Sequence, residues 1–302
     1  MVPQAGPTAA TLGLAAPPAT ARALSRQRPA CQNLTMMETT SALGVDRDLL
    51  RRVLSVESYF EEEERMRAFV RAHAAAIGAR VREERGNLYL TRGEAAVVPG
   101  LVAHLDTRHP ILPPGEFEVR HDAADDVWRA RNRRTGEPAG VGGDDKVGIF
   151  IALTLLADLP AAKVALFREE EWGQRGAHDA DLAFFADCAF AVEADRKGNA
   201  DFVREINGSS LHDDAFAAAV APILARHGYA ECLTGGKTDV HALVLNGLPI
   251  ACANLSCGYF DPHTPRETVR TADVGRALAL VRDICVALGG ARWETERRGA
   301  TP

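Results

Sequence analysis

The sequence predicts an α/β protein: a three-layer sandwich with a mostly parallel central sheet flanked by helices, in a single domain. Three observations predict it. Buried-type strands alternate with amphipathic helices over roughly 250 residues. The composition, 46% hydrophobic and 25% charged with a formal net charge of -6, supplies apolar material for a sizeable core. No internal repeat or interdomain linker interrupts the pattern.

Residues 1–40 stand apart from this pattern. They are rich in Ala, Pro, Thr and Arg and contain no acidic residue before Glu38, so we expect a disordered extension. The composition resembles a transit peptide, although its prolines interrupt an amphipathic helix. A gene start placed too early, with Met36 or Met37 as the true beginning, explains the segment equally well. A polar tail is expected at 293–302.

Two amphipathic helices are expected first, because apolar residues recur at three- and four-residue intervals in 46–56 and 61–79. Glu61 to Glu64 open the second helix, where carboxylates offset the positive helix terminus and lie in water. A pair of strands follows in 80–93, joined by a turn at Gly86-Asn87.

The remaining elements follow in alternation. Residues 115–137 show two short alternating strands with a polar turn, which predicts an exposed hairpin. Apolar runs predict buried strands at 100–105, 162–167, 188–194, 201–206 and 249–256. Helical patterns occupy 146–159, 213–229, 240–248 and 272–290, the last one ending at Gly289-Gly290.

The cysteines, the apolar runs and the charges indicate in which compartment and with which partners the protein acts. Six cysteines, at positions 31, 188, 232, 252, 257 and 285, lack the paired spacing of a metal site, and most lie in apolar runs. We interpret them as buried free thiols of a reducing compartment and expect a cytoplasmic protein. No stretch is apolar enough to span a membrane and no basic stripe is present, so neither a membrane nor a nucleic acid is expected as a partner.

Acidic residues and histidines gather where the predicted strands end. Glu169, Glu170 and Glu171 follow the strand at 162–167 and precede a glycine-punctuated turn. Four further stretches hold His104 and Asp106, Asp144 and Asp145, Asp195, and His263. Open α/β sheets bind ligands at this edge. A mixed set of imidazoles and carboxylates suits zinc or a similar transition metal, whereas magnesium and calcium prefer oxygen alone.

These motifs resemble those of the dizinc exopeptidase families of peptidase T, aminoacylase and carboxypeptidase G, with related zinc aminopeptidases. The shared order is HxD, an Asp followed by Asp-Lys-x-Gly, Glu-Glu-x-Gly, Asp, and a late His in an "HT..E" context, and this chain has every element. The resemblance runs from near residue 49 to near 288. It implies a zinc exopeptidase-like fold with a metallopeptidase catalytic domain at 41–292.

The resemblance also implies two divalent metal ions, zinc before other metals. His104, Asp144 and Asp195 would hold one ion, and Asp144, Glu171 and His263 the other, with Asp144 bridging. Asp106 would accept a hydrogen bond from the far ring nitrogen of His104. The peptide bond after the bridging Asp is often cis in these families, so a cis bond is expected at Asp144-Asp145.

The two acids of Glu-Glu-x-Gly are expected to differ in role. Glu171 ligates metal, whereas Glu170 acts as general base toward a hydroxide between the metals, which attacks an amide carbonyl. Catalytic roles therefore fall to Glu170 and, in support, to Asp106. Glu169 is interpreted as a surface charge at a strand end. Asp239 and His241 are interpreted as structural residues, with contacts to the ligands or the substrate as the alternative. Tyr259 and Phe260 are interpreted as packing residues, with the wall of a pocket as the alternative.

The implied function is hydrolysis of an amide bond in short peptides, by an aminopeptidase or dipeptidase in the first place. A deacylase of N-acyl amino acids from the same dizinc families is the alternative. A carboxypeptidase ranks behind both, because Lys237 stands where peptidase T and its kin have an Arg fork for a carboxylate. A magnesium phosphohydrolase is disfavoured by the two histidines, and a non-catalytic scaffold by the complete motif set.

One departure from the families concerns size. Several relatives carry a lid and dimerisation domain after the fourth ligand, but only 67 residues lie between Asp195 and His263. These residues show the pattern of the catalytic domain itself. We therefore expect no lid, a more open site, and a monomer or an unfamiliar homo-oligomer.

Overall fold

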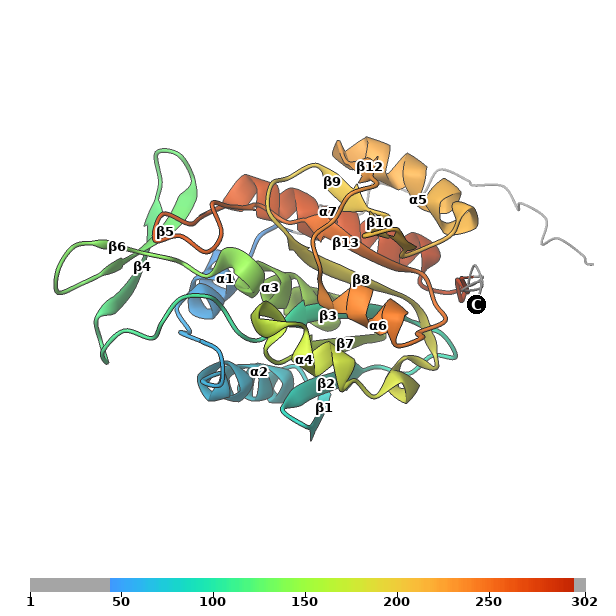
Figure 1. The fold of residues 1–302 in the computed structure, drawn as a ribbon, viewed down its shortest axis with the longest axis horizontal. Coiled ribbons are helices and arrows are strands. Elements are labelled where there is room, and N and C mark those ends of the chain that lie inside the picture. Colours follow the sequence, from blue (N-terminus) through green and yellow to red (C-terminus); the bar gives the residue numbers. More distant parts are fainter. Residues whose placement is uncertain (1–43, 296–302) are drawn as a thin grey trace, which may run out of the picture. The chain divides into compact units, whose positions relative to one another are not determined.

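An eight-stranded sheet forms the centre of the computed structural model, which describes residues 44–295 (Figure 1). In spatial order its strands are β1 (Arg80–Glu84), β2 (Asn87–Arg92), β7 (Ala162–Phe167), β3 (Val98–His104), β8 (Cys188–Arg196), β13 (Cys252–Ser256), β9 (Asp201–Val203) and β12 (Ala230–Cys232). The four neighbours β7, β3, β8 and β13 run parallel. Antiparallel pairs occur toward both edges. The predicted α/β fold is confirmed.

Helices pack on both faces of this sheet and enclose two hydrophobic cores. One core includes α1 (Arg47–Leu54), α2 (Glu64–Ala76), α3 (Gly143–Asp158), α5 (Asp214–His227) and α7 (Thr271–Leu288). The other includes α4 (Arg175–His178), α6 (Asp239–Leu245) and the 3₁₀ turn at Leu182–Phe185. Alternation along β2 divides the two cores: Leu88 and Leu90 face the first and Tyr89 faces the second. The three layers follow from this period of two.

A smaller sheet lies beside the main one and projects from it at the left of Figure 1. It consists of β14 (Tyr259–Phe260), β15 (Thr268–Arg270), β5 (Val127–Asn132) and β4 (Phe117–Asp122), with β6 (Pro138–Ala139) paired to β5. The indole nitrogen of Trp128 donates to the hydroxyl oxygen of Thr271 at 3.0 Å and fastens this sheet to α7. A two-stranded pair, β10 (Glu205–Ile206) and β11 (Ser209–Ser210), lies elsewhere in the fold. The expected hairpin is β4 and β5, but it is only partly exposed, because Val127, Trp128 and Ala130 are buried.

The turn between β1 and β2 lies one residue earlier than the sequence pattern suggested. Its central residues are Arg85 and Gly86, with φ of 52° and 80°. Asn87 instead begins β2 and is buried, where its side chain donates to the Gly176 carbonyl at 2.8 Å and accepts from the Arg168 amide at 3.2 Å. A tight turn with two positive-φ residues matches the twist of the two strands. Because the hydrogen bonds of the buried Asn87 hold it in β2, the turn falls on Arg85 and Gly86.

Three further expectations concern the ends of the chain, the cysteines and membrane-spanning segments. Residues 1–43 and 296–302 lie outside the described residues, and with them the predicted disorder of 1–40, most of the polar tail and Cys31. Among the described cysteines, Cys188, Cys252, Cys257 and Cys285 are buried free thiols, and Cys232 is a half-buried one. No helix within 44–295 is long and apolar enough to cross a lipid bilayer.

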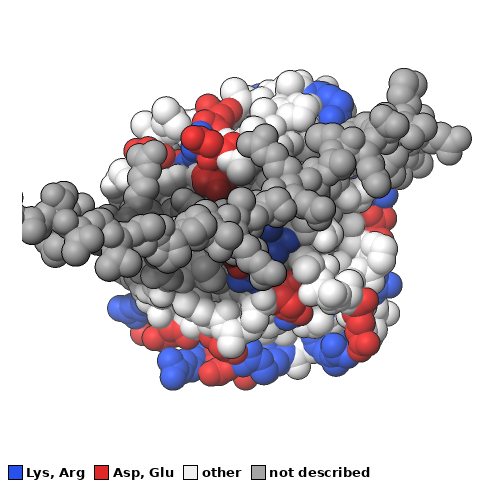
Figure 2. Space-filling model, turned by 90° about the vertical axis from the view of Figure 1, so that its right-hand side faces the viewer, with Lys and Arg blue, Asp and Glu red and all other residues white. Residues whose placement is uncertain are grey.

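Charged residues of both signs share the surface. Acidic and basic side chains are interspersed on the face that Figure 2 shows. Near α2 and β1, Arg71 pairs with both Glu64 and Glu83. Exposed pairs of this kind contribute little to stability one by one, so the fold depends chiefly on its two cores.

Candidate metal centre

The residues singled out in the sequence meet at one edge of the central sheet. His104 ends β3, the Glu169–Glu171 run follows β7, and Asp195 lies near the end of β8. Parallel neighbours bring their carboxyl ends to the same edge, which is where open α/β sheets bind ligands. Asp144 lies at the start of α3, joined to Asp145 by a cis peptide bond as expected. His263 reaches the site from the loop between β14 and β15.

Asp144 lies between two imidazoles. Its Oδ1 is 3.1 Å from His104 Nε2, and its Oδ2 is 3.1 Å from His263 Nε2. On one side, His104 Nε2 is also 3.6 Å from Asp195 Oδ1. On the other side, His263 Nε2 is 2.7 Å from Glu171 Oε1. The five side chains therefore form two adjoining groups that share one carboxylate.

The charges of this site are unbalanced. Burial raises the pKa of the Asp195 carboxyl well above its usual range, and the nearby Asp144 raises it further. Burial would also raise the pKa of Asp144, but hydrogen bonds with His104 and His263 hold it well below its usual range. Hydrogen bonds with Asp144 and Glu171 raise the pKa of His263 to about 10. Three acidic side chains thus share two histidines, and burial makes it costly to ionise all three without a nearby cation.

This imbalance and the donor set fit divalent cations. Groups with the spacing of metal ligands include His104 with Asp144 and Glu171, and His104 with Asp145 and Asp195. Imidazole nitrogens together with carboxylate oxygens suit zinc and similar ions. Asp145 already accepts from the backbone amides of Gly148 at 2.9 Å and His104 at 3.3 Å. Asp144 is therefore the better candidate for a shared ligand.

Asp106 joins the end of β3 to the turn after β7. Its Oδ1 accepts from the Glu170 amide at 2.9 Å, and its Oδ2 accepts from the Glu171 amide at 3.3 Å. His104 Nδ1 lies 3.0 Å from the backbone carbonyl oxygen of Asp106 and 3.4 Å from its Oδ1. The expected contact with His104 thus involves the carbonyl more closely than the carboxylate. Both orient the ring so that Nε2 faces Asp144 and Asp195.

Glu170 is buried beside the two groups. Its Oε1 accepts from the Gln174 side-chain amide at 2.9 Å. Burial raises the pKa of Glu170 to about 8, against the effect of the positive charge on His104. In the described part of the chain, the groups with metal-ligand spacing contain Glu171 and not Glu170. A buried carboxyl with a raised pKa next to such groups is suited to take up and return a proton.

The surface role expected for Glu169 is wrong. Glu169 is buried, and its Oε2 pairs with Arg168 and with Arg175 at 3.1 Å. Its left-handed backbone, with φ of 52°, turns the chain immediately before Glu170. The Glu169 amide donates to Glu63 Oε1 at 2.9 Å. Glu169 therefore fixes the turn that presents Glu170 and Glu171.

Glu63 also departs from the expectation that Glu61 to Glu64 lie in water. Only 2% of it is exposed, and Arg67 Nη1 donates to its Oε2 at 2.8 Å. Burial raises the pKa of Glu63 to about 7, with Asp106 adding to the effect of burial. Glu63 is buried, unlike the rest of the acidic run, because it accepts the hydrogen bond from the Glu169 amide in the turn after β7. Glu61, Glu62 and Glu64 are exposed as predicted.

Four further residues, to which the sequence reasoning gave no role at the site, contact the site or lie next to it. Arg108 Nε lies 3.0 Å from Glu171 Oε2, and its Nη2 donates to the Glu171 carbonyl at 2.7 Å. The Tyr259 hydroxyl donates to Asp195 Oδ1 at 3.1 Å, which exceeds the packing role expected for it. Glu193 lies two residues before Asp195, on the same face of β8, and accepts from the Thr238 hydroxyl. Glu193 could have been identified from the sequence, because it is an acidic residue within an otherwise apolar strand.

Glu267 is the fourth of these residues and the most connected. It is buried; its Oε1 accepts from the Asp144 amide at 3.0 Å and its Oε2 from the Gly142 amide at 2.8 Å. His109 Nε2 lies 2.7 Å from the same Oε2. Glu267 thus holds the loop that carries Asp144. The "HT..E" pattern contained this residue without revealing the contact.

The residues interpreted as structural fall into two kinds. Phe260 packs under the Arg270 guanidinium, 4.2 Å from ring centre to Cζ. Asp239 and His241 are buried, and neither carboxylate oxygen of Asp239 nor Nε2 of His241 has a hydrogen-bond partner among the described residues. Burial raises the pKa of Asp239 well above its usual range, and Glu193 raises it further. Both effects favour the protonated form of this buried acid.

Comparisons with known proteins identify the fold. No family model and no curated protein sequence matches the chain. Aminopeptidase PepT from Bacillus cereus shares the fold with a TM-score of 0.66 and 13% identity, over 80% of this chain and 97% of that one. A tripeptidase from Staphylococcus aureus aligns with a TM-score of 0.61 and 14% identity, over 79% and 97%. Aminopeptidase APDkam598 from Desulfurococcus kamchatkensis aligns with a TM-score of 0.60 and 14% identity, over 80% and 94%.

Proposed function

We propose that this protein is a metal-dependent aminopeptidase or dipeptidase that hydrolyses short peptides. One observation carries the proposal: Asp144 presents one carboxylate oxygen to His104 and the other to His263, beside the buried acid Glu170. The fold it shares with solved aminopeptidases and a tripeptidase supports the same choice.

The residues of the site divide into two ligand sets. His104, Asp144 and Asp195 would hold one divalent cation, and Asp144, Glu171 and His263 the second. Two such ions, zinc in the first place, would polarise the scissile carbonyl and lower the pKa of the attacking water. The Tyr259 hydroxyl orients Asp195, and Arg108 orients Glu171, through the hydrogen bonds described above.

Glu170 moves the proton in this proposal. Its carboxylate accepts a proton from the attacking water and later donates it to the leaving amine nitrogen, so the peptide bond breaks without a free amide anion. Gln174 and the Asp106 carboxylate fix the position of Glu170. Proton transfer of this kind typically contributes about 10²–10⁴-fold to the rate.

The direction of cleavage follows from what surrounds the site. Lys237, the residue in place of an arginine fork, is exposed, and a lone ammonium binds a carboxylate as a point charge only. This favours recognition of the peptide's amino-terminal end over its carboxyl end. Deacylation of N-acyl amino acids uses the same chemistry and is the alternative that the experiment below separates.

The experiment compares aminoacyl p-nitroanilides with N-acetyl amino acids, using purified protein with added zinc. We expect hydrolysis of the anilides, and Glu170→Gln should lower kcat by about 10²–10⁴-fold. Glu62→Gln, an exposed acid-to-amide change, should retain the wild-type rate. Faster hydrolysis of the N-acetyl amino acids would favour the deacylase instead. Full activity of Glu170→Gln would refute the assigned base.

A further inference from the structure

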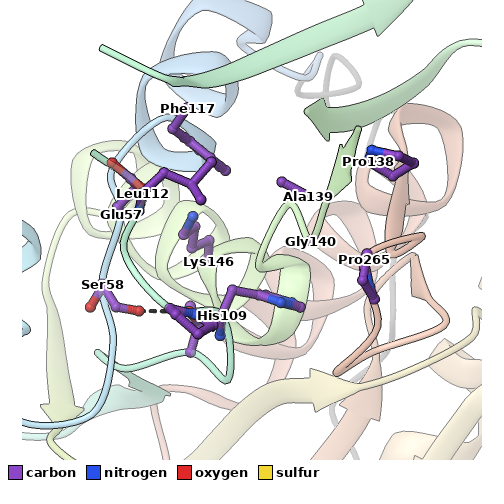
Figure 3. Close-up of a pocket in the computed structure, with 12 residues that line it drawn as sticks. Glu57, Ser58, His109, Leu112, Phe117, Pro138, Ala139, Gly140, Lys146 and Pro265 are labelled. Atoms are coloured by element: carbon purple, nitrogen blue, oxygen red, sulfur yellow. Dashed lines mark hydrogen bonds between the residues drawn. The ribbon is translucent and has the colours of Figure 1, made fainter. Parts of the chain in front are cut away.

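A cavity of about 210 Å³ lies among segments that follow the predicted metal ligands in the chain, and Figure 3 shows residues that line it. Leu112 and Phe117 line one side of it, and Pro138 and Ala139 the opposite side, with Lys146 between them. Sites for whole drug-sized ligands measure roughly 300–1,000 Å³. This cavity, called here the Lys146 cavity, is suited in size to a single side chain.

The polar groups of the Lys146 cavity are largely committed to the protein. Thr107 donates its hydroxyl to the Ser58 carbonyl at 2.6 Å, and Glu57 Oε1 accepts from the Leu112 amide at 2.6 Å. The Lys146 ammonium donates to the carbonyls of Leu54 and Val141, both at 3.0 Å. What these groups leave facing the cavity is mainly carbon, contributed by prolines, Ala139, Leu112 and the Phe117 ring.

An anionic occupant is disfavoured despite the buried lysine. Glu267 and Glu57 both act on the buried Lys146 ammonium as nearby negative charges. Those two carboxylates offset the ammonium charge, and Glu57 itself lines the cavity. A ligand carboxylate that entered the cavity would be repelled by the Glu57 carboxylate. An apolar group would be stabilised there, because its surface is removed from water.

The Lys146 cavity adjoins the metal centre through three segments. Thr107 follows Asp106 in the chain, and Lys146 and Pro265 each lie two residues beyond a predicted ligand. The His109 ring, part of the cavity wall, shares Glu267 with the Asp144 amide. The cavity wall and the predicted metal ligands therefore belong to the same segments of the chain, and Glu267 contacts both.

We propose that the Lys146 cavity binds the side chain of the substrate's amino-terminal residue and selects apolar side chains up to about the size of leucine. This inference rests on the proposed aminopeptidase function, since it names the substrate class of the same site. A pocket that gains or loses one methylene changes kcat/KM by roughly 10–200-fold. Changes to the cavity wall should therefore alter the side-chain preference strongly.

The test measures kcat/KM for glycyl, alanyl, leucyl and phenylalanyl p-nitroanilides. Ala139→Leu fills the cavity and should lower the leucyl-to-alanyl ratio at least about tenfold. Leu112→Ala enlarges it and should raise the phenylalanyl-to-leucyl ratio. Ala96→Leu is the matched control, because Ala96 is exposed in the loop before β3, at the end of the strand remote from the site. Thermal unfolding shows whether each variant folds.

A binding measurement accompanies the kinetics. Saturation transfer from the protein to the methyl protons of L-leucine should occur in wild type and Ala96→Leu and be lost in Ala139→Leu. Hydrolysis with unchanged ratios in both cavity variants would overturn this inference and leave the proposed function standing. Leucine binding that depends on Ala139, without hydrolysis of any anilide, would overturn the proposed function and retain the cavity's ligand class. Neither hydrolysis nor binding would overturn both.

Discussion

Three consecutive glutamates can follow β7 because each has a different partner. Glu169 pairs with Arg168 and Arg175, and Glu170 accepts from Gln174. Glu171 faces His263 on one side and Arg108 on the other. Their mutual repulsion is offset locally, so the turn can present two carboxyl groups to the sheet edge. A run of like charge at a strand end is informative for this reason.

At the scale of single residues, the first prediction concerns Tyr259. Tyr259→Phe removes the hydroxyl that donates to Asp195. Loss of such an orienting hydrogen bond typically lowers metal affinity by about 10–100-fold, and we expect zinc affinity to fall by that order. Tyr229→Phe is the matched control, since its buried hydroxyl donates to the Ser256 carbonyl away from the ligands. Equal zinc affinities in a competition titration of both variants would contradict the role of Tyr259.

The second prediction concerns the pH dependence of stability through Glu63. In the folded protein its pKa is raised from 4.5 to about 7. Between these values the folded state keeps a proton that the unfolded state has released, so the free energy of unfolding falls as pH rises through this window. The fall is at most about 3 kcal/mol, at 1.36 kcal/mol per pKa unit. Glu63→Gln should lack this component.

Urea unfolding at pH 5 and pH 8 measures the effect of Glu63. The stability difference between Glu63→Gln and wild type should shift in favour of the variant at pH 8. Glu62→Gln, which changes an exposed neighbour, should follow the wild-type profile. Parallel profiles for Glu63→Gln and wild type would show that the carboxyl of Glu63 keeps an ordinary pKa.

At the scale of elements, the pattern of the sequence predicted the long strands and helices that lead to the site, but not its short elements, β14, β15, α4 and the 3₁₀ turn at Glu170–Trp172. Periods of two and 3.6 residues report burial within one element. They do not report which distant segment an acid meets. Glu63 contacts a turn 106 positions away, and Glu267 holds the Asp144 amide from 123 positions away. These two residues were missed for that reason, whereas His104 and Asp195 were found from their places at strand ends.

The third prediction concerns the turn joining β1 and β2. Gly86 has φ of 80°, and a Cβ there would lie 2.8 Å from Arg168 Cδ. Gly136 has φ of 79° with nothing within 4 Å of the corresponding position. Left-handed backbone costs an L-residue roughly 1–2 kcal/mol, so both Gly→Ala variants should be destabilised. Gly86→Ala should lose more, because Arg168 must also move.

Chemical denaturation of these two glycine variants isolates the contact with Arg168. Equal losses would mean that Arg168 shifts freely. The distinction bears on the site, because Arg168 pairs with Glu169 at the start of the turn that carries Glu170 and Glu171. A larger loss in Gly86→Ala together with a reduced kcat would show that the hairpin supports the position of Glu170.

At the scale of the whole molecule, the parallel strands β7, β3 and β8 explain why residues far apart in sequence converge. Their carboxyl ends deliver Glu171, His104 and Asp195 to one edge. The segment between Asp195 and His263 forms strands of the central sheet and the helices α5 and α6, so no separate lid domain lies between them. The order of motifs predicted this arrangement. The Lys146 cavity, built from loops, the small sheet and the start of α3, left no periodic signal.

The most direct test of the central claim is the metal content of the protein. After removal of metal with a chelator and equilibration with zinc, elemental analysis should give about two zinc ions per wild-type chain. Asp144→Asn, which alters the shared carboxylate, should retain at most about one under the same conditions, with the fold intact by circular dichroism. A wild-type chain that binds one ion or none, or an Asp144→Asn chain that binds as many as wild type, would contradict a two-metal centre built around Asp144.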